Sequence, residues 1–240
     1  MDLKLMAPCH FGLEAVTKRE IINLSPTIKI DRVEDGRIFY TGCASDLIRS
    51  NIMLRTPERV LVVIGEFCAK DFEDLYQGVL ALPWEDYLPV DAKFWVKKAA
   101  AVKSRVYSPR DIQAIAKKAI VERLKRTYHK EHFPETGDEY PIRIFVKKDL
   151  VTIALDSSGT SLHKRGYRKE AGEAPISETL AAALVMLTPF NDKRILCDPF
   201  CGSGTIAIEA AMLAKNIAPG ANRHFTIMIR GYFQLFPPWE

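Results

Sequence analysis

Short apolar runs and amphipathic segments alternate regularly through the first 70 residues. Apolar runs at residues 3–7, 28–33, 37–40 and 59–65 predict strands, and apolar residues at helical spacing in residues 12–24 and 46–54 predict helices. The Glu34-Asp35-Gly36 string predicts the turn of a hairpin between the second and third strands. The order β-α-β-β-α-β is typical of a split βαβ, ferredoxin-like unit, to which we assign residues 1–69.

The next segment contains longer elements with clear start signals. Asp71, with an acid three residues later, predicts the N-cap of one helix, and Ser108-Pro109 followed by Asp111 predicts the start of another. The second of these helices has an apolar stripe from Ile112 to Leu124. Apolar runs at 94–98, 142–146 and 150–155 predict a strand and a second hairpin.

The last third of the chain contains an apolar run that ends at an acid, from Arg194 to Asp198. A Gly-Ser-Gly turn at 202–204 and an apolar helical segment at 205–214 follow it. This order predicts a buried parallel strand, a glycine elbow and a covered helix, the first step of a doubly wound sheet. Gly202 and Gly204 would let a ligand approach the backbone, and the free N–H groups of the helix start favour an anionic group.

The spacing of the glycines excludes two common nucleotide sites. It is neither G-x-G-x-x-G nor a P-loop, since no G-K-[ST] string follows. An ordinary strand-to-helix turn remains the structural alternative to a ligand site. Upstream, Pro175 at the first helical position, with Leu180, Leu184 and Leu187 behind it, predicts a helix beside the motif strand.

Positive charge is concentrated in the middle of the chain, although the net charge is only +4. Residues 93–148 carry 15 Lys/Arg against 6 Asp/Glu, a net charge of +9, whereas residues 1–92 carry 10 against 15, a net charge of −5. Such a block indicates either a polyanion-binding surface or a set of solvated helix faces. The cations that we expect to contact a nucleic-acid backbone are Lys103, Arg105, Arg110, Lys117, Lys118 and a second cluster, Lys164, Arg165 and Arg168. For the second cluster, a solvated linker remains an equal alternative.

Nothing in the sequence indicates a metal centre, a disulfide framework or a membrane span. The five cysteines include no C-x-x-C pair, which is typical of reduced thiols in a cytoplasmic protein. His129 and His132 have a spacing that could hold a metal, but no Asp or Cys set accompanies them. No apolar run approaches the ~20 residues of a membrane span, and no signal peptide is visible. We therefore expect a cytoplasmic protein.

Three groups of motifs resemble one family. Asp198-Pro199-Phe200-Cys201-Gly202-Ser203-Gly204-Thr205 resembles the first motif of S-adenosylmethionine-dependent methyltransferases that modify exocyclic amino groups of nucleobases. Residues 60–156, above all Lys103-Ser104-Arg105 and Ser108 to Ile112, resemble a THUMP domain, an RNA-binding module. Leu162 to Arg168 and Glu173 to Glu178 resemble the linking segments of the THUMP-containing RNA guanine-N2 methyltransferases, which act on bacterial 23S rRNA or on tRNA.

This resemblance implies an α/β chain with an α+β N-terminal half. It comprises a ferredoxin-like unit (1–69), a THUMP domain (70–156) and the start of a Rossmann-like doubly wound methyltransferase domain (157–240). It implies S-adenosylmethionine as cofactor and RNA as partner. The residues implied to hold the cofactor are Asp198, Pro199, Phe200, Cys201, Gly202, Ser203, Gly204 and Thr205, with Pro175 and Ile176 beside its methionine end.

Two parts of the family's catalytic site do not occur in this sequence. The D/N-P-P-[YF] loop is absent, since Phe236-Pro237-Pro238-Trp239 lacks the Asp or Asn and lies too early. The acid that would hold the cofactor ribose is also absent. We therefore expect a C-terminally truncated catalytic domain that is inactive alone. A stand-alone RNA-binding module and a DNA adenine-N6 methyltransferase remain alternatives, and the THUMP-like region argues against the latter.

Overall fold

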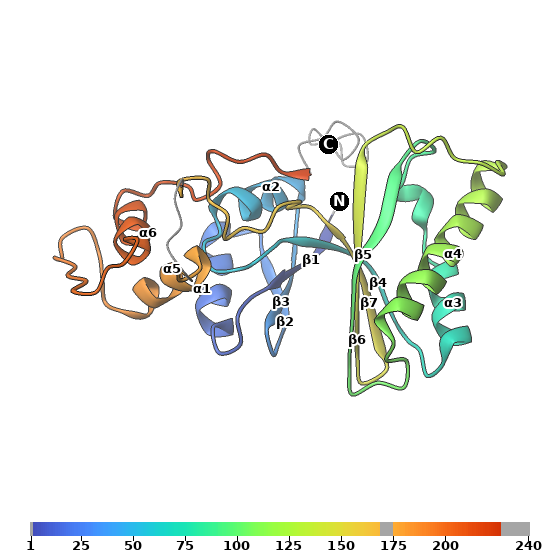
Figure 1. Cartoon of the computed structure of the whole chain (residues 1–240), viewed down its shortest axis with the longest axis horizontal. Coiled ribbons are helices and arrows are strands. Elements are labelled where there is room, and N and C mark those ends of the chain that lie inside the picture. The colour runs from blue at the N-terminus through green and yellow to red at the C-terminus, as the bar shows by residue number, and fades with distance from the viewer. Residues whose placement is uncertain (1, 169–174, 227–240) are drawn as a thin grey trace. The chain divides into compact units, whose positions relative to one another are not determined.

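The computed structural model describes residues 2–168 and 175–226, which fall into two units (Figure 1). Of these, residues 2–60, 160–168 and 175–225 form the first unit, and residues 61–159 with Thr226 form the second. Residues 169–174 and the Phe236–Trp239 string lie outside the described part of the chain. None of the described helices combines the length and apolarity that crossing a bilayer requires.

The first unit begins with a three-stranded antiparallel sheet and two helices. The strands are β1 (Leu3–Pro8), β2 (Lys29–Glu34) and β3 (Arg37–Gly42), in the order β2-β3-β1, and the helices are α1 (Glu14–Leu24) and α2 (Ala44–Met53). Both helices pack against β3. Leu5, Ile21 and Leu47 are core residues without solvent exposure, and the buried Tyr40 hydroxyl donates to Ser50 Oγ (2.9 Å). The predicted elements of this region are confirmed.

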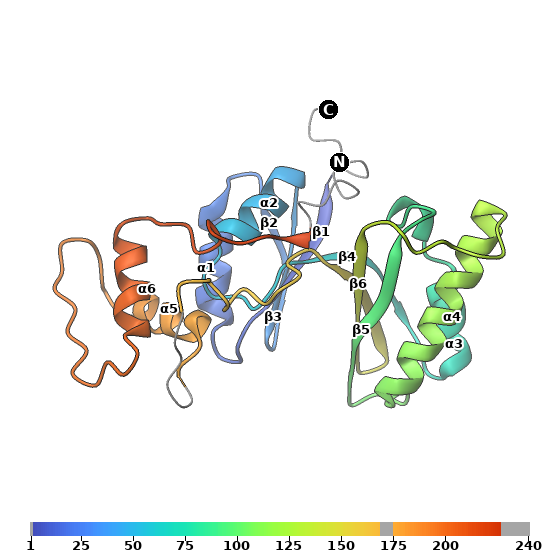
Figure 2. The same ribbon diagram turned by 45° about the horizontal axis from the view of Figure 1, so that its top comes forward.

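The second unit is a four-stranded sheet that carries both of its long helices on one side (Figure 2). Its strands are β4 (Leu61–Cys68), β5 (Lys93–Val102), β6 (Glu139–Lys147) and β7 (Leu150–Asp156), and its helices are α3 (Phe72–Leu80), the short η1 (Trp84–Asp86) and α4 (Pro109–Tyr128). The strand order is β4-β7-β6-β5, in which only β5 and β6 run parallel. β5 is therefore the last strand on its side of this sheet.

The two long helices of the second unit begin after the N-cap residues that the sequence predicted. The Asp71 carboxylate accepts a hydrogen bond from the Asp74 N–H (2.8 Å) at the start of α3, and Ser108 Oγ accepts from the Asp111 N–H (3.4 Å) at the start of α4. Pro109 occupies the first helical position, where its missing N–H costs nothing. Helix α4 then runs for 20 residues and carries the basic surface predicted for this segment.

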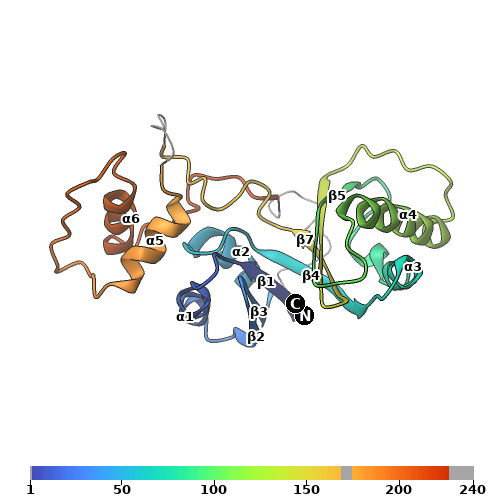
Figure 3. The ribbon, with the colours of Figure 1, turned by 60° about the horizontal axis from the view of Figure 1, so that its bottom comes forward.

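The remainder of the first unit departs from the sequence prediction at the motif strand. Helices α5 (Glu178–Leu187) and α6 (Thr205–Ala214) lie side by side (Figure 3), but residues 194–198 form no strand and Ile195 is fully exposed. A strand is stable only where neighbouring strands accept and donate its backbone hydrogen bonds. No described strand lies beside residues 194–198, so the predicted strand is wrong for this structure.

The helix predicted from Pro175 also begins later than expected. Ser177 is the N-cap of α5, where its Oγ accepts from the Leu180 N–H (3.4 Å), so Pro175 precedes the helix. The buried face of α5 consists of small residues such as Ala181, whereas Leu184 and Leu187 are exposed. The helix lies beside the motif segment as predicted, but Leu184 and Leu187 are exposed and Leu180 is only partly buried.

Candidate functional site

The glycine elbow between residues 198 and 205 has the backbone conformation that its sequence requires. Gly202 (φ 53°) and Gly204 (φ 73°) both lie in the left-handed region, where residues with a Cβ are strained. The Gly204 N–H donates to Cys201 O (2.7 Å), and the Phe200 N–H donates to Asp198 Oδ1 (3.2 Å). The turn leads directly into α6, so the first N–H groups of that helix face outward and favour an anionic ligand.

The residues of the elbow are accessible. Phe200 is 93% exposed, and Cys201, Gly202 and Ser203 are exposed as well. No other atom lies within 4 Å of the position that a Cβ would take at Gly202 or Gly204. The glycines are therefore required by backbone conformation and leave open space in front of the turn.

An apolar hollow of about 440 Å³ adjoins the elbow. Leu184 and Val185 of α5 form one wall, residues 188–190 and 194–199 form most of the rest, and Ile206 of α6 completes it. Asp198 and Pro199 belong to both the hollow and the elbow. The arrangement places one carboxylate and a set of backbone N–H groups beside an apolar wall, a combination typical of sites for small organic ligands.

Arg168 links the last residue of the elbow to the segment before α5. Its Nη2 atom donates to Thr205 Oγ1 (2.7 Å) and to the Ile176 carbonyl oxygen (3.1 Å), and it lies 3.5 Å from Glu178 Oε1. Its side chain is only 19% exposed. One guanidinium thus joins two of the predicted cofactor residues, Ile176 and Thr205, while the half-buried Pro175 directly precedes Ile176. The sequence predicted that Arg168 contacts RNA, whereas in the structure its guanidinium contacts the elbow.

Arg165 is buried in the first unit, and the structure does not support its predicted contact with RNA. The residue is 3% exposed. Its Nη1 donates to Leu162 O (2.6 Å), its Nη2 donates to Arg55 O (2.5 Å), and its Nε lies 3.4 Å from Glu209 Oε1 on α6. A buried guanidinium is stable only with such partners, because desolvation of an unpaired charge is costly. Of the predicted cluster, Lys164 is exposed.

Glu209 is the centre of a buried polar network that the sequence did not reveal. It is 1% exposed and also accepts a hydrogen bond from the Tyr167 hydroxyl (3.0 Å). Burial, and then the neighbouring Glu209 carboxylate, raises the pKa of Tyr167 well above its ordinary value. Within an otherwise apolar helix the only available signal was this single acid. The network fixes α6, and with it the elbow, to residues 162–167.

Glu58 makes a second connection between the early and late segments of the first unit. Its carboxylate accepts hydrogen bonds from Thr179 Oγ1 (2.6 Å) and Ser161 Oγ (2.8 Å) and lies 2.9 Å from His163 Nδ1. Burial alone would raise the pKa of Glu58, but the hydrogen bonds from Thr179, His163 and Ser161 lower it below its ordinary value. An ionised Glu58 therefore helps to hold the start of α5 in place.

The five basic residues predicted in the central block are all exposed and belong to the second unit: Lys103, Arg105, Arg110, Lys117 and Lys118. The Arg105 N–H donates to Asp149 Oδ1 (2.8 Å), which ties the loop before α4 to the β6–β7 turn. Lys118 Nζ lies 5.9 Å from the centre of the Tyr76 ring. Three of the five line a groove between α4 and β5, so the structure gathers them beside one concave surface.

Metal ligation receives no structural support within residues 2–168 and 175–226. No group of three His, Cys, Asp or Glu side chains there has a geometry that could hold a metal ion. All five cysteines are free thiols.

Three family models match successive segments of the chain. The RlmL ferredoxin-like domain matches residues 4–61, the THUMP domain matches residues 69–156, and the RMKL-like methyltransferase domain matches residues 165–235. The three matches together cover most of the chain, in the order that the sequence motifs implied.

Individual relatives agree with these matches. The chain is 48% identical over 223 residues to the protein named "Putative RNA methyltransferase YpsC" of Bacillus subtilis (strain 168), covering 92% of this chain and 57% of that protein. The structure of "a predicted N6-adenine-specific DNA methylase" from Listeria monocytogenes str. 4b F2365 is similar with a TM-score of 0.91 at 44% identity, covering 99% of this chain and 62% of that one.

A third similar structure is that of "SMU.472, a putative methyltransferase complexed with SAH". Its TM-score is 0.88 at 42% identity, covering 100% of this chain and 61% of that one. The chain thus spans about three fifths of the length of these relatives.

Proposed function

We propose that this chain provides the RNA-binding part and the first cofactor-binding elements of an S-adenosylmethionine-dependent RNA methyltransferase. The chain matches, in this order, the RlmL ferredoxin-like domain, the THUMP domain and the RMKL-like methyltransferase domain. The observation that carries the proposal is the geometry of the Asp198–Thr205 elbow. Two left-handed glycines hold an open turn at the start of α6, beside an apolar hollow and a carboxylate.

The residues of the elbow fit the methionyl part of S-adenosylmethionine. The N–H groups at the start of α6 suit its carboxylate, because a helix N-terminus stabilises negative charge. Asp198 offers a carboxylate for a cationic group such as its ammonium, and the adjoining hollow suits an apolar portion. S-adenosylmethionine, when bound, supplies an electrophilic methyl group. The chain's own role is to hold and orient that donor.

We propose guanine N2 of 23S rRNA or tRNA as the methyl acceptor. An exocyclic amine is a weak nucleophile, since its lone pair is delocalised into the ring, and it must be held in line with the methyl group. A paired guanine would have to leave its stack to reach such a site. The THUMP match and the exposed cations of α4 support RNA as the substrate, because phosphate contacts supply affinity and positioning.

A DNA adenine-N6 methyltransferase is the second candidate, favoured by the name of the Listeria relative. The motif at 198–205 resembles both classes, so it does not separate them. The THUMP match favours RNA over DNA. Binding of structured RNA and of duplex DNA at matched salt separates the two candidates, because salt controls the shared electrostatic contribution. Preference for duplex DNA would reject RNA as the substrate.

Calorimetric titration with S-adenosylhomocysteine tests the cofactor site. We expect the chain to bind this product and Asp198→Asn to weaken binding about 10-fold or more, since a charge-assisted contact contributes roughly 1.5–3 kcal/mol. Asp192→Asn, in the same loop region but outside the elbow, is the matched control and should bind as the unaltered chain does. Absence of binding would reject the cofactor site and leave a stand-alone RNA-binding module.

Transfer of a radiolabelled methyl group from S-adenosylmethionine to RNA tests the catalytic step separately. We expect no transfer by this chain, because its sequence lacks the D/N-P-P-[YF] loop. Methylation of rRNA or tRNA by the 240-residue chain would show that other residues present the base.

A further inference from the structure

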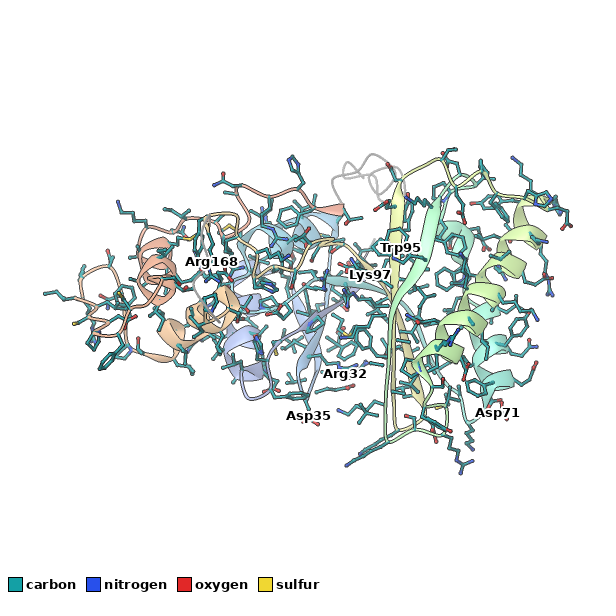
Figure 4. All side chains as sticks on the ribbon, viewed as in Figure 1. Arg32, Asp35, Asp71, Trp95, Lys97 and Arg168 are labelled. Carbon is teal, nitrogen blue, oxygen red and sulfur yellow. The ribbon has the colours of Figure 1, made fainter. Side chains whose placement is uncertain are left out.

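The second unit contains a groove of about 650 Å³ between α4 and the outermost strand of its sheet. Trp95 and Val96 of β5 form one wall, and Arg110, Gln113 and Lys117 are among the residues of α4 that form the other. Trp95 and Lys97, both of β5, are labelled in Figure 4. An aromatic residue therefore lines a concave surface together with cationic residues.

Trp95 differs from the other described tryptophan in a way that indicates a surface role. Trp84 is fully buried, and its indole N–H donates to Val79 O (2.7 Å), as is usual for a core tryptophan. Trp95 is only half-buried, and none of the described residues accepts a hydrogen bond from its indole. Trp95 thus lines the groove and keeps part of its surface open to solvent.

The cations along the groove differ in how far other side chains neutralise them. Toward the C-terminal end of α4, Lys125 pairs with Glu131 (2.7 Å). Toward its N-terminal end, Arg110 and Lys117 form no ion pair with any described carboxylate. Their charge is therefore available to an anionic ligand at the part of the groove where Gln113 Nε2 donates to Val96 O (3.1 Å) and links helix to strand.

We propose that this groove binds an unpaired stretch of RNA, with one base stacked on Trp95 and adjoining phosphates against Arg110 and Lys117. An aromatic platform beside cations is the combination that single-stranded nucleic acid requires, because an unstacked base offers its face and the backbone its charge. The bases of a duplex are stacked on one another and cannot take this position. The inference rests on the proposed function in that it specifies which form of RNA the chain recognises.

Fluorescence anisotropy with a labelled single-stranded RNA, and with a duplex of the same length, tests the groove directly. We expect the single strand to bind more tightly and Trp95→Ala to weaken that binding by roughly 10-fold, within the range measured for one base–aromatic stack. Trp95→Phe keeps an aromatic face and should lose less. Neither substitution should change the salt dependence, since no charge is removed.

Lys117→Gln should instead lower the slope of log affinity against log salt by about 0.7, the effect of one phosphate contact on a single strand. Lys70→Gln removes the same charge from an exposed position outside the groove and should leave the slope unchanged. Circular dichroism of each variant establishes that it is folded. If Trp95→Ala does not fold, Trp95→Phe and Lys117→Gln still test the proposal.

Four results would overturn the groove assignment. They are undetectable binding of single-stranded RNA at low salt, equal affinity for the duplex, no effect of the folded Trp95 variants, and tighter Trp95-dependent binding of an acidic peptide. Calorimetry with S-adenosylhomocysteine separates this failure from failure of the proposed function. A chain that binds the cofactor product but not single-stranded RNA would refute the groove alone.

Discussion

Replacement of Arg165 by Met tests whether this residue is structural or contacts RNA. The change removes the hydrogen bonds to Leu162 O and Arg55 O and the guanidinium that lies 3.4 Å from the buried Glu209 carboxylate. The Arg165 and Glu209 side chains are 1% and 0% exposed, so solvent cannot replace the lost contacts. Breaking a buried pair on one side costs about 3–5 kcal/mol.

Differential scanning calorimetry measures this loss. With roughly 2–4 °C of melting temperature per kcal/mol for chains of 150–250 residues, the first unit should unfold roughly 6–20 °C earlier. Lys164→Met, at the exposed neighbouring position, is the matched control and should change the melting temperature little. The double variant R165M/E209M should recover much of the loss, because an apolar pair of similar size fills the same space without an uncompensated charge.

Unchanged stability of Arg165→Met would refute the burial argument. A folded Arg165→Met variant with native stability and strongly weakened RNA binding would instead support the sequence-based prediction that Arg165 contacts the RNA backbone.

Two further predictions concern the same unit. The lowered pKa of Glu58 means that its carboxylate stabilises the fold above the ordinary glutamate pKa, and that this contribution is lost as pH falls through the lowered folded-state pKa. Glu58→Gln should therefore destabilise the chain in urea denaturation at pH 7, and the difference should disappear at acidic pH; a constant difference at all pH values would contradict the assignment. Gly204→Ala should cost about 1 kcal/mol through its left-handed backbone alone, since no atom beyond the two adjacent residues lies within 4 Å of the added Cβ. Gly204→Asn should cost less because Asn tolerates that conformation, and equal losses for the two variants would indicate a steric rather than a conformational cause.

Features determined by neighbouring residues were predictable from the sequence. The N-caps Asp71 and Ser108 act within three residues of themselves, so a short string specifies them. The hairpin of β2 and β3 follows from apolar runs around a turn containing Gly36, which has a positive φ of 73°. The glycine elbow was predictable for the same reason, since Gly202 and Gly204 are required by local backbone conformation.

Features determined by distant partners were not predictable. The run at 194–198 has the composition of a buried strand, but a strand forms only with hydrogen-bonding neighbours, and the described residues provide none there. Arg165 belongs to a basic segment whose composition is typical of a solvated surface. In the structure it is buried beside Glu209, which lies 44 positions away in the sequence. No local pattern specifies such a pair, because charge alone does not reveal burial.

The central claim is that the Asp198–Thr205 elbow binds the methyl donor. Hydrogen–deuterium exchange of the backbone amides, with and without saturating S-adenosylhomocysteine, tests it most directly. The claim predicts slower exchange across residues 198–206, including the first amides of α6, with little change in α4 of the second unit. Unchanged exchange at the elbow, with saturation established by calorimetry, would contradict it.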